Sequence, residues 1–141
     1  MSLKFFNELS GTLAIELTEP TKDIAANLAN QRATATAKIS ELSFAPEVFE
    51  GGKFRELTGE ELDRVVLELS VLNLRGFGDA VAHPAPNGKW FTVRDLVAAV
   101  SETERRTRHQ TGWYGGIDVH HVYFEGIHPG DDGVWAIHWG S

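Results

Sequence analysis

The chain has 141 residues, of which 42% are hydrophobic and 23% charged, a composition typical of a globular protein. Its 20 acidic and 13 basic residues give a formal net charge of −7, which argues against nonspecific nucleic-acid binding, because that binding depends on clustered positive charge. The absence of cysteine excludes a disulfide framework, thiolate metal sites and a cysteine nucleophile. No apolar run is long enough for a membrane span and no signal-peptide pattern is present, so we expect one cytoplasmic domain over residues 1–141 that binds neither membrane nor nucleic acid.

The first fifty residues are the least decisive part of the sequence. Leu13, Ile15 and Leu17 alternate and predict a strand over 12–18. Two interpretations remain open after Pro20: a short helix followed by a strand over about 33–44, or one helix over 20–42. The alternating Ala and Thr residues of 33–37 suit neither state well. We favour the helix followed by the strand.

Two capping patterns predict helices in the middle of the chain. Thr58 with Glu61 predicts a helix over Gly59–Asn73, although the run 65–74 is also typical of a strand. Gly76–Lys89 has the Gly and Pro content of a long loop. Thr92 begins the clearest helix, Val93–Arg108. We interpret the arginines that end this helix (Arg105, Arg106 and Arg108) as partners of Glu102, Glu104 and the terminal carbonyls rather than as an anion site.

The C-terminal residues predict a β-hairpin with two different faces. The strands are Ile117–Gly126 and Val134–Gly140, with a turn at 128–133. If Ile127 lies opposite Val134, one face is apolar and forms the core: Val122, Phe124, Trp135, Ile137 and Trp139. The opposite face, which includes Ile127, collects His121, Tyr123, Glu125 and His138. In this register Tyr123 and His138 are direct neighbours across the strands.

Two interpretations of the polar face follow. His121, Tyr123, Glu125 and His138 are suited to acid–base catalysis, and His121 with His138 are candidate ligands of a divalent metal, with a third ligand from His83 or Asp79. The simpler interpretation, which we favour, is that these residues form the ordinary polar side of an antiparallel sheet. A divalent metal cofactor is possible but is not the interpretation that we favour. We expect His120 to lie at the edge of the core, bonded to Asp118.

Four further residues are candidates for ligand binding. Trp113 and Tyr114 form an aromatic pair before two glycines, which suits a stacking platform for a planar ligand or a plug that closes the core. His83 and Asp79 lie in the expected long loop, where binding residues are frequent.

The predicted fold class is α+β. We expect an antiparallel sheet of about four to five strands that ends in the C-terminal hairpin and packs against two or three helices. The last strand is so apolar that it must lie inside the sheet or at a dimer interface. The function that we favour is a noncatalytic module that binds a small ligand or a protein partner, with a homo-oligomer as one form. The alternative is a small enzyme that uses the His/Tyr/Glu pocket.

Overall fold

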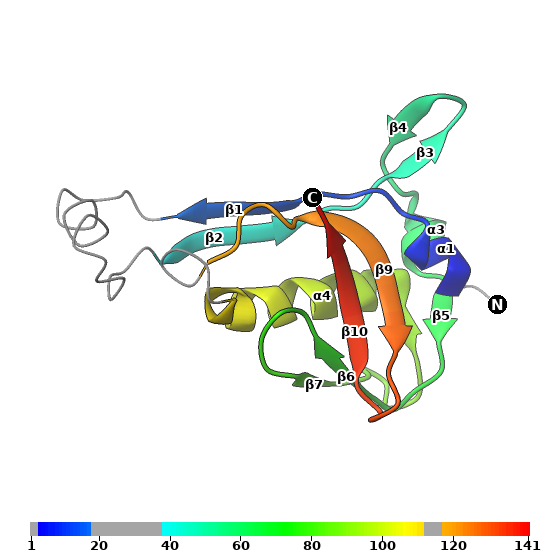
Figure 1. Cartoon of the computed structure of the whole chain (residues 1–141). Coiled ribbons are helices and arrows are strands. Elements are labelled where there is room, and N and C mark those ends of the chain that lie inside the picture. The colour runs from blue at the N-terminus through cyan, green and yellow to red at the C-terminus, as the bar shows by residue number, and fades with distance from the viewer. Residues whose placement is uncertain (1–2, 18–37, 112–116) are drawn as a thin grey trace, which may run out of the picture.

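The computed structural model describes residues 3–17, 38–111 and 117–141. In chain order the elements (Figure 1) are α1 (Leu3–Asn7), β1 (Leu13–Leu17), β2 (Ile39–Phe44), β3 (Val48–Glu50), β4 (Lys53–Arg55), α3 (Gly59–Leu62), β5 (Val65–Leu67), β6 (Val71–Arg75), β7 (Val81–Pro84), β8 (Phe91–Thr92), α4 (Val93–Thr107), the 3-10 turn η1 (Arg108–Gln110), β9 (Tyr123–Pro129) and β10 (Trp135–Gly140). Of the helices described, none is both long and apolar enough to cross a bilayer.

The main sheet has four strands in the order β7-β6-β10-β9. The last strand of the chain, β10, is central, as its apolar sequence requires, because it pairs with both β9 and β6. The α+β class with a C-terminal hairpin is confirmed. The expectation of a purely antiparallel sheet is wrong, since β10 runs parallel to β6. The long connection that a parallel pair needs contains α4. Two-stranded pairs β1–β2, β3–β4 and β5–β8 surround this sheet.

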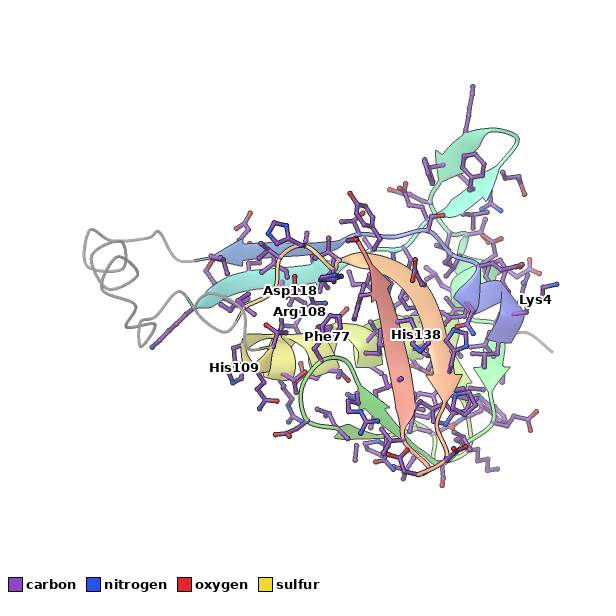
Figure 2. The ribbon with its side chains drawn as sticks, in the orientation of Figure 1. Lys4, Phe77, Arg108, His109, Asp118 and His138 are labelled. Atoms are coloured by element: carbon purple, nitrogen blue, oxygen red, sulfur yellow. The ribbon has the colours of Figure 1, made fainter. Side chains whose placement is uncertain are left out.

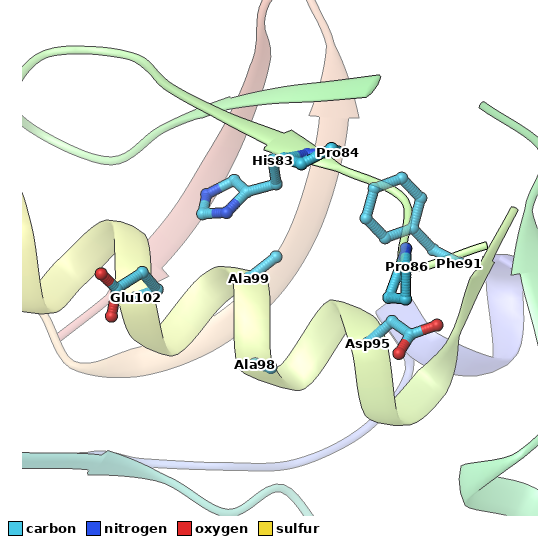
Figure 3. Close-up of a pocket in the computed structure, with 8 residues that line it drawn as sticks. All are labelled: His83, Pro84, Pro86, Phe91, Asp95, Ala98, Ala99 and Glu102. Carbon is cyan, nitrogen blue, oxygen red and sulfur yellow. The ribbon is translucent and has the colours of Figure 1, made fainter. Parts of the chain in front are cut away.

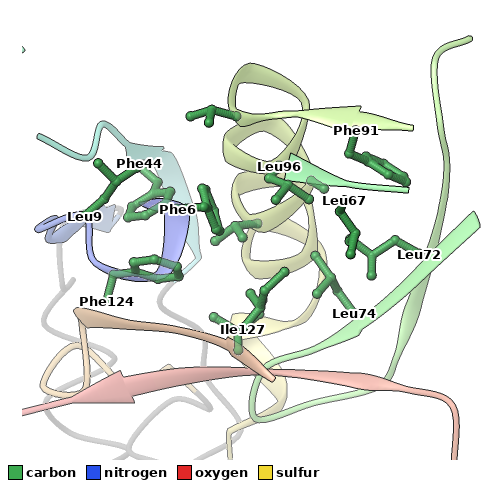
Figure 4. Close-up of a cluster of buried hydrophobic side chains, with 14 of the residues drawn as sticks. Phe6, Leu9, Phe44, Leu67, Leu72, Leu74, Phe91, Leu96, Phe124 and Ile127 are labelled. Atoms are coloured by element: carbon green, nitrogen blue, oxygen red, sulfur yellow. The ribbon is translucent and has the colours of Figure 1, made fainter. Parts of the chain in front are cut away.

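Among the described residues α4 is the longest helix, and it carries the core. Its N-terminus has the expected capping box, in which Thr92 accepts from the Asp95 N–H and the Asp95 carboxylate accepts from the Thr92 N–H. The buried side of α4 presents Val93, Leu96 and Val100, all fully excluded from solvent. They join a cluster shared with α1, β2, the sheet and β8 (Figure 4), whose labelled members are Phe6, Leu9, Phe44, Leu67, Leu72, Leu74, Phe91, Leu96, Phe124 and Ile127.

The predicted helix over Gly59–Asn73 is wrong beyond its first turn. The capping box between Thr58 and Glu61 is present, but α3 ends at Leu62 and two strands, β5 and β6, follow. In β6 the buried Leu72 and Leu74 alternate with more exposed neighbours, which is strand periodicity. The predicted loop Gly76–Lys89 is also wrong in part, because β7 lies within it and pairs with β6.

The N-terminal prediction of a strand followed later by a second strand is confirmed where the structure describes it. The first strand is β1, and β2 pairs with it in antiparallel fashion. A single helix over 20–42 is wrong, because residues 39–42 belong to β2. The helix expected after Pro20 falls outside the described residues.

The C-terminal hairpin forms with a different register from the predicted one. Ile127 faces Ile137 rather than Val134, and Trp139 faces Phe124. Glu125 and Gly126 therefore both lie opposite His138, as a β-bulge, and Gly126 has a φ of +100° that only glycine adopts easily. The bulge brings Phe124 and Ile127 onto the same buried side.

The burial of the hairpin side chains shows which part of the predicted faces is correct. Phe124, Ile137 and Trp139 are buried as expected, and Val122 and Trp135 pack partly buried against the core. Ile127 was expected on the polar face and is fully buried. The strand limits also differ, because β9 begins only at Tyr123 and includes His128 and Pro129, which we expected in the turn.

Candidate functional site

Of the four predicted polar-face residues, Tyr123, Glu125 and His138 lie on the exposed side of β9 and β10, whereas His121 lies outside these strands. His121 precedes β9 and contacts Asp118. Tyr123 is exposed and lies opposite Gly140, and the Glu125 carboxylate lies against the same glycine. His138 lies on β10 (Figure 2), opposite the bulge at Glu125 and Gly126, with its ring 4.5 Å from the ring of His128. The predicted cross-strand pair of Tyr123 and His138 is therefore wrong. Among the described residues no three His, Cys, Asp or Glu side chains form a metal-binding group.

The ligand-binding candidates occupy different places. The His83 Nε2 lies 2.7 Å from the Thr103 hydroxyl, beside a shallow pocket of about 240 Å³ between β7 and α4 (Figure 3). Burial, and secondarily the positive charge of Arg106, lower the pKa of His83. Asp79 instead holds Gln110: its N–H donates to the Gln110 side chain over 2.8 Å and its carboxylate accepts back over 3.2 Å. Trp113 and Tyr114 lie outside the described residues.

One predicted residue, His121, does belong to a polar constellation. The Asp118 carboxylate accepts from the His121 Nδ1 over 2.6 Å and from the backbone N–H groups of His120 and His121. Burial by itself raises the pKa of Asp118, but these hydrogen bonds outweigh burial and hold the pKa below its usual range. Asp118 is thus ionised at neutral pH and Nδ1 carries the ring proton. The expected bond between Asp118 and His120 is made by the backbone N–H of His120, and this residue is exposed rather than at the edge of the core.

The segment that carries Asp118 and His121 is held in place by a buried arginine (Figure 2). The Arg108 Nη1 donates to the carbonyl oxygens of Asp118, over 3.0 Å, and His121, over 2.8 Å. Its guanidinium carbon lies 5.3 Å from the centre of the Phe77 ring and 5.4 Å from that of Trp139, within cation–π range. The edge of Phe77 also meets the His121 ring, at 5.9 Å between centres.

A buried glutamate balances the charge of this arginine. The Glu104 Oε1 lies 2.6 Å from the Arg108 Nε, and the Glu104 Oε2 accepts from the Trp139 indole over 3.2 Å. Burial raises the pKa of Glu104, while Arg108 and Trp139 oppose the rise. Among the described residues the Arg108 Nη2 has no hydrogen-bond partner. The network therefore fixes the backbone between Asp118 and His121, and it requires that two charged side chains be buried.

The sequence contained a signal for this network that we did not use. Glu104 and Arg108 continue the four-residue spacing of Leu96 and Val100, so they lie on the buried stripe of α4. The expected pairing of Glu104 with Arg108 is present, but we did not identify it as buried, whereas the side chains are 1% and 0% exposed. Through Arg108 the end of α4 contacts the segment before β9.

A second notable feature is an exposed aromatic pair on the β3–β4 hairpin, which projects from the body of the molecule (Figure 1). Phe49 and Phe54 face each other across the strands. Their ring centres are 4.9 Å apart, and the residues are 57% and 60% exposed. Gly51 and Gly52 have φ values of +61° and +80°, which suit a tight two-residue turn. The hairpin therefore presents a preformed apolar tip to solvent.

Two grooves lie at the foot of this hairpin. The tyrosine groove, of about 540 Å³, is lined by Ser10, Gly11, Thr12, Ala45, Glu47, Phe54, Tyr123 and Phe124. The leucine groove, of about 530 Å³, is lined by Phe44, Ala45, Pro46, Glu47, Glu56, Leu57, Leu62 and Val97. The two grooves share Ala45 and Glu47, so together with the aromatic pair they form one continuous region around the hairpin.

No family model, no curated protein and no solved structure matches this chain.

Proposed function

We propose that this chain is a noncatalytic binding module that holds a protein partner through the β3–β4 hairpin and the two grooves at its foot. The exposed pair of Phe49 and Phe54 carries the proposal. Aromatic side chains are enriched at the centres of protein interfaces, because they bury large apolar areas on binding. Four other phenylalanines, Phe6, Phe44, Phe91 and Phe124, are buried in the core of this chain, which makes the exposed pair more notable.

The architecture of the hairpin supports the same function. The β3–β4 pair has no third strand among the described residues, and an isolated two-stranded hairpin is at best marginally stable in water. A bound partner that covers the aromatic pair adds the packing that the fold does not supply. The exposed Tyr123 in the tyrosine groove extends the aromatic surface towards β9.

The shape of the two larger grooves, rather than their size, favours a protein over a small ligand. The pocket beside His83 has about 240 Å³, below the range of roughly 300–1,000 Å³ that is usual for small-molecule sites. The two larger grooves are open and adjoin a protruding tip. A protruding tip with grooves at its base suits another protein surface better than an enclosed small molecule.

Copurification tests this proposal. Tagged wild-type chain, a Phe49→Ser/Phe54→Ser variant and a Val71→Ser control are expressed in cells that also contain the untagged protein. Val71 is 48% exposed and lies on β6, away from the hairpin. We expect a bound protein, whether another chain or an untagged copy, to be lost from the aromatic variant alone. Equal recovery with all three tagged chains would contradict the proposal.

The second candidate function is acid–base catalysis, which the Asp118–His121 pair favours. Asp118 fixes the proton on Nδ1 over 2.6 Å, which leaves Nε2 of a side chain that is 41% exposed as a proton acceptor. An oriented imidazole of this kind acts as a general base and contributes about 10²–10⁴-fold to a rate.

Nitrophenyl acetate and nitrophenyl phosphate are suitable probes of the second candidate. Acid–base catalysis by His121 predicts that His121→Ala abolishes any hydrolysis above the buffer rate, while His138→Ala, an exposed control outside the constellation, does not. A wild-type rate equal to that of His121→Ala for both probes would count against the enzyme.

A further inference from the structure

We propose that the partner is a second copy of this chain, with two β3–β4 hairpins side by side around a twofold axis and the tip of each in the leucine groove of the other. This inference rests on the proposed function, because it names the protein that the hairpin binds. It follows from three observations: matching apolar surfaces, unpaired charges of opposite sign, and the position of the groove relative to the tip.

The apolar surfaces match because the same chain carries a protrusion and a recess. The protrusion is the pair of Phe49 and Phe54, each more than half exposed. The recess is the leucine groove, whose apolar lining comes from Phe44, Ala45, Pro46, Leu57, Leu62 and Val97. An aromatic anchor in a pocket of this kind is the usual centre of an interface.

The charges of tip and groove are complementary. Lys53 is exposed at the tip of the hairpin, next to Phe54, whereas Glu47 and Glu56 line the leucine groove. None of these three side chains takes part in an ion pair within the described part of the chain. The neighbouring Arg55, by contrast, is already held by Glu50 and Glu61. A lysine and two carboxylates thus remain for contacts between chains.

The position of the groove permits a closed dimer. Glu47 immediately precedes β3 and Glu56 immediately follows β4, so the leucine groove lies at the foot of the hairpin. Each strand has three residues, about 10 Å at the usual rise. Two hairpins that pass each other in opposite directions around a twofold axis place each tip at the other's foot. Such an interface uses the same surface twice and cannot extend into a filament.

Sedimentation velocity with charge-reversal variants tests this arrangement. The wild type, Lys53→Glu and Glu56→Lys are measured from about 5 μM to 1 mM, a range that covers the affinities of small interfaces. Both residues are exposed, and melting curves confirm that the variants fold. We expect the wild type to dimerise and each variant to dimerise at least about tenfold more weakly, because both of its symmetry-related contacts become repulsive.

A mixture of the two variants provides the decisive test of these contacts. In a Lys53→Glu chain paired with a Glu56→Lys chain, both contacts join opposite charges again, so the mixture is expected to dimerise about as well as the wild type. A wild type that stays monomeric to about 1 mM overturns the inference. So does dimerisation that the single variants leave unchanged, or a mixture that does not recover.

The failure of this inference differs from the failure of the proposed function. If the wild type is monomeric but the copurification shows a different protein that is lost with Phe49→Ser/Phe54→Ser, the binding module stands and its partner is not a second copy. If nothing depends on the aromatic pair in either experiment, the proposed function itself fails.

Discussion

Glu104 and Arg108 form an ion pair with 2.6 Å between Oε1 and Nε, and both side chains are closed to solvent. The pair lies at the junction of α4, β10 and the segment before β9, because Trp139 bonds to Glu104 and the carbonyls of Asp118 and His121 bond to Arg108. A pair in this position stabilises one arrangement of the three elements. If one member of the pair is removed, the other charge stays buried without a counter-charge and destabilises the folded state.

Removing one member of this pair should destabilise the protein strongly. We expect Glu104→Gln to lower the free energy of unfolding by about 3–5 kcal/mol, because the Arg108 charge stays buried without its counter-charge. Urea denaturation measures the loss. Glu102→Gln is the matched control, since Glu102 pairs with Arg105 and Arg106 on the exposed side of the same helix, where about 1 kcal/mol or less is expected. Similar small losses of unfolding free energy in both variants would show that the buried pair stabilises the fold no more than the exposed one.

The capping glutamate of α3 predicts a pH dependence. Hydrogen bonds from the Arg55 side chain, and secondarily from the Thr58 backbone, lower the pKa of Glu61 to about 2. Because the folded pKa lies below the ordinary value of about 4.5, the stability that Glu61 contributes is complete above that value and is lost as the pH falls towards 2. Between pH 6 and pH 3 the melting temperature of Glu61→Gln should therefore fall less than that of the wild type.

Glu60→Gln is the control for that experiment, since Glu60 is an exposed neighbour on the same short helix. Its melting temperature should follow that of the wild type across the acid range. If Glu61→Gln and Glu60→Gln give the same acid profile, the contact between Arg55 and Glu61 does not control this pH dependence.

The hydrogen bond of Asp118 fixes the tautomer of His121. In the neutral ring we expect the proton on Nδ1, because an ionised carboxylate 2.6 Å away can only accept. Long-range proton–nitrogen spectra of ¹⁵N-labelled protein identify which ring nitrogen is protonated. Asp118→Ala should shift the population towards the Nε2–H form. A wild-type ring that already carries its proton on Nε2 would contradict this geometry.

The bulge in β9 depends on glycine. A Cβ at position 126 would lie 3.0 Å from both Asn7 Cγ and His128 Nε2, at a φ of +100°. We expect Gly126→Ala to cost about 1–3 kcal/mol in thermal or urea unfolding. Gly59→Ala is the control, because a Cβ there meets nothing within 4 Å and the backbone is helical. Equal stability of the two variants would mean that the bulge tolerates other residues.

The same bulge explains where the sequence prediction failed. Strict alternation from Ile127 placed Tyr123 opposite His138, whereas the extra residue at Glu125–Gly126 changes which residues share a face. A glycine inside a strand pattern is a known signal of a bulge, and we did not apply it. Alternation also placed Asp118 and His121 on opposite faces of a strand, but the chain there belongs to no strand, and the Asp118 carboxylate accepts from the backbone two and three positions later.

Local signals were reliable only over the distance at which they act. The box of Thr92 and Asp95 began a helix whose buried stripe continued for four turns, so α4 was predicted almost to its last residue. The box of Thr58 and Glu61 also formed, yet α3 ended at Leu62. The following residues are strands because β8, β7 and β10 pair with them, and a sequence pattern does not reveal such distant partners. The exposure of Phe49 and Phe54 likewise depends on what the rest of the chain leaves uncovered.

Photocrosslinking from position 54 tests most directly whether the aromatic hairpin is a binding surface. A benzophenone amino acid replaces Phe54 in one version of the protein and Val71 in a control version, and both are irradiated in the cells that produce the protein. We expect a discrete crosslinked product from position 54 and none from position 71, with the mass of two chains if the partner is a second copy. No product from position 54, or the same products from both positions, would contradict it.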